Sequence, residues 1–399
     1  MGVTPPTRRI YALSVNADQL RRTRDEVVRV GRRGENWVTF ATEVTEVIRR
    51  VVPFDRSCWH TVDPGTVLFT GSLNQDVVCS GSWLAEHEYV IDDVNKWWFL
   101  ARSGRMAGAT SLATHGDLSR SARHRSHATY GIGDELRCSF VVESTYWGAT
   151  AFLRDEGRPW FTEDEVRFLA SLSGALAEGF RRALVSAVVT DEVVAGVDGP
   201  GVVVFDEHGT VESVSPAAEH WIFQMVEEPR PSGAADSKMI QAVASRARAL
   251  GMVDDAPAPL AARSRVRTRR GSWLLLYGTS LHGGRGGRTA VIIQPAAPGD
   301  VAPLVALAYG LSERECQVTQ LCMQGLPTKQ MARMLNVSTY TIQDHLKSIF
   351  DKTGVRSRGG LVGQVFLEHY VPRWEGLTTA PQGWSLRGSP GVAPLSKPG

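Results

Sequence analysis

The side chains with the clearest binding chemistry lie in residues 338–353 of this 399-residue sequence. Ser338 is suited to cap a helix in which Ile342, Leu346 and Ile349 recur at helical spacing, and this spacing predicts one buried face. The other side of the helix would carry mainly hydrogen-bonding groups, namely Tyr340, Gln343, Asp344, Lys347, Ser348 and Asp351. A helix that is anchored by one face and polar on the other can read base edges in the DNA major groove.

Two shorter helices are expected upstream, and they would fix the position of this third helix. The first begins after the cap Ser312 and runs to about Gln324, and the second runs from a cap at Thr328 to about Leu335. Asn336 follows, and asparagine is one of the few residues other than glycine that tolerate a left-handed turn. The pattern predicts a tight helix-turn-helix unit.

Basic side chains would surround the third helix and contact DNA phosphates; they are Lys329, Arg333, Lys347, Lys352, Arg356 and Arg358. The positive excess is small, since residues 311–370 hold seven lysines and arginines against five acidic residues. Periodicity and caps alone also fit a charged helical bundle that binds another protein, so both interpretations stay open at this level.

Residues 311–370 contain three segments that are typical of one family. They are Leu311-Ser-Glu-Arg-Glu, Gly325-Leu-Pro-Thr-Lys-Gln-Met-Ala and Val337-Ser-Thr-Tyr-Thr-Ile-Gln-Asp-His-Leu-Lys, continued by Lys352-Thr-Gly-Val-Arg-Ser-Arg. The region resembles the LuxR-type (GerE-like) helix-turn-helix, and the match continues without a gap. The resemblance implies a DNA-binding transcription regulator that is not an enzyme.

The resemblance also implies roles for individual residues. Lys329 and Thr341 match the family's phosphate contacts. Ile342 and Gln343 occupy its usual base-facing positions, and His345 its conserved histidine. With the neighbouring polar and basic side chains, the expected DNA-binding set is Thr328, Lys329, Arg333, Tyr340, Thr341, Ile342, Gln343, Asp344, His345, Lys347, Arg356 and Arg358.

The sequence departs from the commonest family pattern at two positions of the reading face. The family commonly has lysine where Gln343 stands and asparagine where Asp344 stands. Glutamine can pair with adenine and a carboxylate can accept from cytosine, which predicts a readout that is not dominated by guanine. A last helix at about 360–370, with Leu361, Val365 and Leu367, is where this family dimerises.

Residues 35–190 predict an α/β sensor domain. An amphipathic helix is expected over 37–51, and apolar strand-like segments follow at 57–62, 66–70, 139–143 and 149–153. Thr162 and Glu165 form a capping box that opens a helix over about 163–188. Its narrow apolar stripe fits either a partner helix in a dimer or a single-chain core. The segment Trp160-Phe-Thr-Glu-Asp-Glu-Val-Arg-Phe-Leu, with the strands before it, resembles a GAF domain.

Residues 196–297 predict a smaller α+β domain. A hairpin over 202–214 leads to a helix at Pro216, a second helix covers 239–250, and strands follow at 265–268, 273–280 and 289–294. The segments Gly201-Val-Val-Val-Phe-Asp-Glu-His-Gly and Ser215-Pro-Ala-Ala-Glu resemble a PAS-like domain. The sequence therefore predicts a multidomain chain with an α/β GAF-like domain, a smaller α+β PAS-like domain and an all-α, four-helix LuxR-type domain.

The remaining segments are expected to connect or flank these domains. Residues 1–34 read as a solvated, arginine-rich leader helix in preference to a DNA-binding arm. The proline- and alanine-rich residues 298–310 predict a linker, and 371–399 predict a disordered tail.

Aromatic residues in the first domain suggest a ligand pocket, although aromatic side chains also serve as plain core. The candidate lining is Trp59, Trp97, Trp98, Tyr130 and Trp147. His115, His124 and His127 lie in an Arg- and Ser-rich stretch and are interpreted as a polar surface loop in preference to a metal or haem site.

Bulk properties fit a cytoplasmic protein without a cofactor. The formal net charge is only +2, no apolar run is long enough to span a membrane, and the five cysteines show no metal or disulfide spacing. No phosphate-binding loop, nucleophile elbow or HExxH motif is found. The expected partners are double-stranded DNA, a second copy of the chain, a small-molecule ligand and RNA polymerase. The alternatives are control by a protein partner, or by redox chemistry at Cys79 and Cys138.

Overall fold

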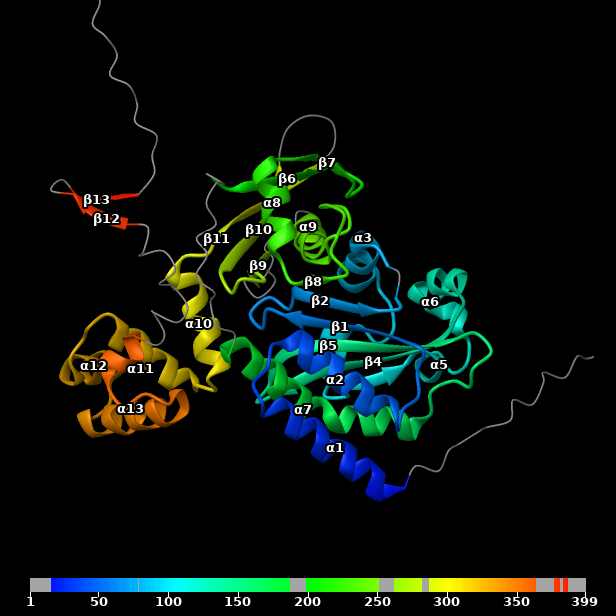
Figure 1. Cartoon of the computed structure of the whole chain (residues 1–399), viewed down its shortest axis with the longest axis horizontal. Coiled ribbons are helices and arrows are strands. Elements are labelled where there is room, and N and C mark those ends of the chain that lie inside the picture. Colours follow the sequence, from blue (N-terminus) through cyan, green and yellow to red (C-terminus); the bar gives the residue numbers. More distant parts are fainter. Residues whose placement is uncertain are drawn as a thin grey trace, which may run out of the picture.

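The computed structural model describes residues 16–77, 79–186, 199–250, 262–281, 287–363, 377–380 and 383–386. Two sheet-containing domains pack against each other, and a small helical domain is joined to them through one helix (Figure 1). This arrangement confirms the predicted multidomain class, with α/β domains first and a helical domain at the C-terminal side.

The first domain is built on an antiparallel sheet that places sequentially distant strands side by side. Its order is β3 (Ala107–Ala109), β4 (Ile132–Val142), β5 (Thr145–Asp155), β1 (Arg56–Val62) and β2 (Phe69–Gln75). A short sixth strand, β8 (Glu227–Glu228), comes from the second domain and pairs in parallel with β2. The predicted strands at 57–62, 139–143 and 149–153 are confirmed, whereas the strand predicted at 66–70 runs over Phe69–Gln75.

Three helices cover one face of this sheet: α1 (Ala17–Gly31), α2 (Trp37–Arg49) and α7 (Glu163–Ser186) (Figure 1). The leader helix is therefore part of the domain, because Val27 and Val30 of α1 are buried in its core. Helices α1 and α7 approach closely at two glycines, and a Cβ on Gly31 would lie 3.3 Å from the Cα of Gly179. The boundary predicted at residue 35 is accordingly wrong.

Helix α7 opens with the predicted capping box. The backbone N–H of Glu165 donates to the Thr162 hydroxyl at 3.3 Å, and the N–H of Thr162 donates to the Glu165 carboxylate at 2.8 Å. Its apolar stripe, including Leu169, Leu172 and Leu176, is buried in the core of its own domain. These apolar side chains are covered by the chain's own core, so the interpretation that they pack against a partner helix in a dimer is wrong.

Short helices occupy the other side and the ends of the sheet; sequence periodicity gave no signal for them. They are α3 (Gly81–Ala85), η1 (Glu86–Val90), α4 (Trp97–Ser103), α5 (Thr110–Ala113), η2 (Leu118–Arg120), α6 (Ala122–His127) and η3 (Ala128–Tyr130). Each is at most seven residues long, which is too short for a helical period to repeat.

In its described residues, the second domain has a five-stranded antiparallel sheet and two helices. The strand order is β7 (Val211–Val214), β6 (Gly201–Phe205), β11 (Arg288–Pro295), β10 (Trp273–Leu281) and β9 (Arg263–Arg267). Helix α8 (Pro216–Gln224) begins at the predicted proline, after the cap Ser215, and α9 (Lys238–Leu250) matches the second predicted helix. The predicted order of elements is confirmed.

The two domains share an apolar cluster, which is separate from the cluster under α1, α2 and α7. Helix α9 lies between the two sheets (Figure 1), and ten of its residues, 238–247, are buried. Its Met239 and Val243 belong to the same apolar cluster as Leu68 and Phe69 of the first domain. Arg265 on β9 forms a bidentate ion pair with the buried Asp63 of the first domain, with contacts of 2.7 and 2.5 Å. These contacts fix the domains relative to each other.

Residues 298–308 form a helix, α10 (Pro298–Ala308), where a linker was predicted. Val301, Leu304 and Val305 are buried against the first domain's core, because they recur on one side of the helix. Tyr309 and Gly310 then lead directly to Leu311, which is buried in the core of the helical domain. The linker prediction is wrong, since proline at the first turn begins a helix as readily as it ends one.

The helical domain contains α11 (Glu313–Met323), α12 (Thr328–Leu335) and α13 (Thr339–Thr353), and residues 358–363 begin a further helix. Leu361 of that helix is buried in the domain's own core, whereas the predicted dimer residues Val365 and Leu367 lie outside the described residues. Within the predicted disordered tail, β12 (Leu377–Ala380) and β13 (Gly383–Leu386) pair as a short hairpin. That part of the disorder prediction is wrong.

Candidate DNA-binding interface

The turn between α12 and α13 has the predicted geometry. Asn336 adopts the left-handed conformation at φ 53°, and Ser338 caps α13 by accepting from the N–H of Thr341 at 3.0 Å. The cap of α12 is Pro327, so the prediction that Thr328 is the cap is wrong. Pro327 has no side-chain cap bond, and its carbonyl accepts from the backbone N–H groups of Gln330 at 2.9 Å and Met331 at 3.1 Å.

The inner face of α13 forms the core of the helical domain. Leu346 and Ile349 pack with Val318 of α11 and Met331 of α12, as the helical spacing predicted. Ile342 belongs to this core and has 0% exposure. The family resemblance had also implied that Ile342 faces a base, and that part is wrong, because a fully buried side chain cannot contact DNA.

The outer face of α13 is open to solvent and polar. Gln343, Asp344 and Lys347 are exposed, and within the described residues none of the three has a hydrogen bond or ion pair to another side chain. Tyr340 at the start of the helix is 71% exposed. Donors, acceptors and an aromatic ring are therefore presented on one surface of a rigid helix, which is the arrangement that reads base edges.

Glu315 joins the first helix to the third. Its carboxylate accepts from the N–H of Ser312 at 2.6 Å, from the Ser348 hydroxyl at 2.6 Å and from the Lys352 ammonium at 2.7 Å. Burial alone would raise the pKa of this carboxyl, but the hydrogen bonds outweigh burial and lower the pKa to about 2. Ser348 and Lys352 were predicted on the outer side and at a phosphate, and both are instead held by Glu315.

Among the other predicted DNA contacts, some side chains are exposed without a side-chain partner among the described residues, and others are already hydrogen-bonded within the domain. Lys329, Arg333 and Arg356 are exposed beside α13 and are available to phosphates. Arg358 donates to the Thr328 hydroxyl at 2.6 Å and to the carbonyl of Leu326 at 3.3 Å, so it also holds the start of α12. Thr341 and His345 are half-buried on α13, and the Thr341 hydroxyl lies 2.8 Å from that of Ser338.

The geometry of α11–α13 defines a helix-turn-helix DNA-binding domain. Residues 310–364 match the family model described as bacterial regulatory proteins, luxR family. A 48-residue stretch is 44% identical to the nitrate/nitrite response regulator protein NarP of Escherichia coli; it covers 12% of this chain and 22% of NarP. The helical domain is therefore a LuxR-type helix-turn-helix, which is a non-enzymatic DNA-binding domain of transcription regulators. The chain spans about a fifth of the curated relative that it matches.

Solved structures also resemble the chain. The phycoerythrobilin-bound GAF domain from a cyanobacterial phytochrome is 13% identical, with a TM-score of 0.30, covering 42% of this chain and 97% of that one. The bacteriophytochrome RpBphP3 from the photosynthetic bacterium R. palustris is 11% identical, with a TM-score of 0.31, covering 72% of this chain and 64% of that one.

The aromatic residues predicted to line a pocket do not converge. Trp59 is fully buried in the core with Phe140 and Phe152. Trp97 is buried in the other cluster, where its indole N–H donates to the carbonyl of Thr150 at 3.0 Å. Tyr130 is 56% exposed and Trp98 is half-exposed. Of the five, Trp147 lines a cavity of about 330 Å³ between the two N-terminal domains, and the other four do not.

The predicted polar loop around the three histidines is a set of short helices with a buried side. His127 of α6 is buried and stacks on Trp83 at 4.4 Å, and burial lowers its pKa to about 4. Beneath it, Arg123 and Arg137 pair with Glu135 at 2.6 and 3.2 Å in a fully buried network. Sequence analysis missed this network because its members come from different elements. No group of three metal-ligating side chains occurs in the part of the chain that the structure describes.

The cysteines lie in surroundings that suppress the reactive thiolate. Cys58 and Cys138 are buried, and burial raises the pKa of both thiols, to about 12 for Cys58. Burial also raises the pKa of Cys79. The thiolate is the form that attacks and is oxidised, so these positions are poorly suited to redox sensing.

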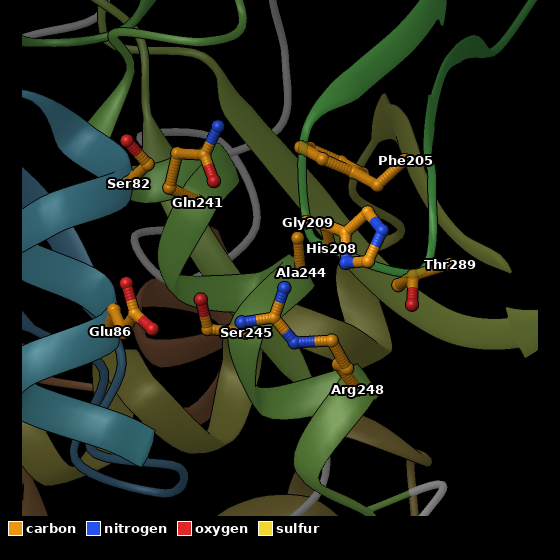
Figure 2. Close-up of a pocket in the computed structure, with 10 residues that line it drawn as sticks. All are labelled: Ser82, Glu86, Phe205, His208, Gly209, Gln241, Ala244, Ser245, Arg248 and Thr289. Carbon is orange, nitrogen blue, oxygen red and sulfur yellow. The ribbon is translucent and has the colours of Figure 1, made fainter. Parts of the chain in front are cut away.

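A small polar pocket lies where η1 of the first domain meets α9 (Figure 2). Figure 2 shows Glu86 on one side of the pocket and Arg248 on the other, with His208 from the β6–β7 turn nearby. The pocket holds about 30 Å³, which is room for a water or two.

Within the described residues no helix is both long and apolar enough to cross a membrane.

Proposed function

We propose that the protein is a homodimeric transcription regulator whose two N-terminal domains sense a signal and position two helix-turn-helix domains on a pseudo-palindromic operator. The observation that carries this proposal is the outer face of α13. Tyr340, Gln343, Asp344 and Lys347 are exposed there on a helix whose opposite face is buried in the domain core. The LuxR-type match over 310–364 supports DNA as the ligand of that face.

Gln343 is the residue that we expect to contribute most to sequence selection. Its amide is exposed near the middle of the outer face, and an amide can bond both polar groups of adenine in the major groove. Lys329, Arg333 and Arg356 would contact phosphates and fix the register of the helix. Asp344 would repel phosphates, which is one reason to expect weak binding by a single domain.

A dimer follows from this weak electrostatic contribution. Seven basic against five acidic residues in 311–370 give one domain only a small positive excess. Two domains joined in one molecule raise the effective concentration of the second at its half-site, which compensates for weak single contacts. A two-fold dimer would require half-sites about one helical turn apart.

The proposed route from signal to DNA runs through α10. This helix is anchored by Val301, Leu304 and Val305 on the N-terminal domains and is separated from the cap of α11 by only three residues, 309–311. A change in how α10 packs on the N-terminal domains would therefore move the helical domain. Burial raises the thiol pKa of both Cys79 and Cys138, which makes redox control the weaker alternative, and control by a protein partner would use the same connection.

The experiment that tests the proposal is selection of genomic fragments by the purified full-length protein, Gln343→Ala and Gln320→Ala. Gln320 is exposed on α11, away from the outer face of α13, so it is the matched control. We expect wild type and Gln320→Ala to enrich the same pseudo-palindrome, and Gln343→Ala to enrich an altered one. Unchanged selection by Gln343→Ala with uniformly weaker binding would refute its role, and absence of any enriched sequence would refute the function. A single copy on the operator at micromolar concentration would refute the dimer.

A further inference from the structure

A cavity of about 330 Å³ lies where the two N-terminal domains and α10 meet. Its wall combines the start of α2, strands β1 and β2, the end of α7, strand β9 and Leu304 of α10. Cavities that bind small molecules in proteins are typically about 300–1,000 Å³ and often lie at domain interfaces. The size and the position are those of a ligand site.

The apolar part of the wall is mainly aromatic. Trp37, Trp147 and Trp273 line the cavity together with Phe180 and Leu304. Trp147 and Trp273 are also more than nine-tenths buried, and within the described residues their indole N–H groups have no acceptor. A buried tryptophan normally has an acceptor for its N–H, so this wall is suited to an apolar molecule that also carries acceptor atoms.

The polar part of the wall is mainly cationic. Arg265, Arg267 and Arg269 line the cavity, and Glu228 is the acidic residue among the lining side chains. Glu228 pairs with Arg269, and Asp63 behind the wall pairs with Arg265, and cationic side chains outnumber acidic ones among the described lining residues. Burial of cationic side chains is unfavourable, and an anionic group in the cavity would offset that cost.

Arg267 places its guanidinium in this wall, against the backbone and an aromatic ring. It is half-buried, its guanidinium lies 5.4 Å from the ring centre of Trp273, and it donates to the carbonyls of Gly271 and Leu184. Burial lowers its pKa to about 10, which reflects the cost of holding this charge away from water.

We infer that this cavity binds a small aromatic or otherwise apolar molecule that carries one carboxylate. The apolar body would pack against the three indole rings, and the carboxylate would accept from the arginines of β9 and its following turn. Because Leu304 of α10 forms part of the wall, the occupant would contact the helix that leads to the DNA-binding domain. This inference deepens the proposed function by naming the class of signal.

Binding can be measured on the full-length protein by titration calorimetry without DNA. The probe is 2-naphthoate, and 2-naphthamide is the uncharged molecule of nearly the same shape. We expect the carboxylate to bind at least about tenfold more tightly than the amide, because charge-assisted hydrogen bonds to arginine are the stronger ones. This comparison uses the wild-type protein and so does not depend on the folding of any variant.

Three variants locate the site. Ala183 of α7 lines the cavity, so Ala183→Phe would fill it and should abolish binding, and Arg267→Gln should weaken the carboxylate to about the level of the amide. Arg288→Gln removes a cation from an exposed position on β11 of the same sheet and should bind as wild type. Circular dichroism melting identifies any variant that fails to fold.

Each outcome supports or overturns the inference. Absence of 2-naphthoate binding at millimolar concentration, or unchanged binding by a folded Ala183→Phe, would overturn the site. Equal affinity for the amide would overturn the anionic ligand class. Operator binding is measured separately in the selection experiment: lost probe binding with intact operator selection would count against the cavity alone. Intact probe binding without operator selection would count against the proposed function alone.

Discussion

Replacement of Glu315 by glutamine should loosen the attachment of α13 without altering the exposed outer face of that helix. Glu315 holds α13 through Ser348 and Lys352 and holds the start of α11 through Ser312. The lowering of its pKa from 4.5 to about 2 corresponds to roughly 3 kcal/mol in favour of the ionised form in the folded state. Glutamine keeps the shape but loses the charge, and we expect about 2–3 kcal/mol of this stabilisation to disappear.

Hydrogen exchange of the α13 amides in the full-length protein is the direct assay. A loss of about 2–3 kcal/mol in the opening free energy should accelerate exchange by roughly 30- to 150-fold. The matched control is Glu313→Gln, because Glu313 is exposed in the first turn of the same helix and, among the described residues, makes no hydrogen bond or ion pair with α13. Only a small loss of helix-dipole stabilisation, about 0.3–1 kcal/mol, is expected there.

The stabilisation of α13 by Glu315 should decrease at acid pH. The pKa of Glu315 is lowered in the folded state, so its contribution is fully present above pH 4.5 and is lost as the pH falls toward about 2. Exchange of α13 in the wild-type protein should therefore approach that of Glu315→Gln at acid pH. The reasoning would be refuted by wild-type exchange rates in Glu315→Gln at neutral pH, or by an equal acceleration in Glu313→Gln.

Three further perturbations follow from the structure. Asp344→Asn removes a negative charge from the exposed outer face of α13, which we propose faces DNA, and should strengthen operator binding about three- to tenfold at low salt, measured by fluorescence anisotropy. Burial keeps His60 and His127 neutral in the folded protein and lowers both pKa values below 6.5. Below pH 6.5 the unfolded chain therefore binds more protons than the folded chain, and the free energy of unfolding, measured by chemical denaturation, should fall as the pH is lowered. His127 should account for roughly 3 kcal/mol of this loss by pH 4. Asp63→Asn leaves Arg265 buried without its carboxylate and should destabilise the contact between the N-terminal domains by about 3–5 kcal/mol.

Each of these has a contrary result. Unchanged affinity and salt dependence in Asp344→Asn would place the residue away from the phosphates. Stability that is flat between pH 6.5 and 4 would mean that the two histidines titrate normally in the folded protein. Two separate unfolding transitions in the wild-type protein, with Asp63→Asn changing neither, would mean that the two N-terminal domains are not coupled through this ion pair.

Local signals in the sequence were sufficient for the helix-turn-helix. The cap Ser338, the left-handed Asn336 and the spacing of Ile342, Leu346 and Ile349 all act within a few residues of one another. Elements of that kind form wherever the short-range backbone and side-chain chemistry is satisfied. The order of strands and long helices in the N-terminal domains was predictable for the same reason.

Only the tertiary structure decided the features that depend on distant partners. Ile342 is core and not a base contact because α11 and α12 cover it, and Lys352 is bound because Glu315 reaches it from 37 residues away. The prolines of α10 led to the prediction of a linker, and only the packing of α10 against the first domain's core shows that this segment is a buried helix. The cavity has no sequence signature, since its wall is assembled from both domains and from α10. The sequence by itself determined the helix-turn-helix and the polar face of its third helix; packing over long separations decided which side chains of that helix are exposed.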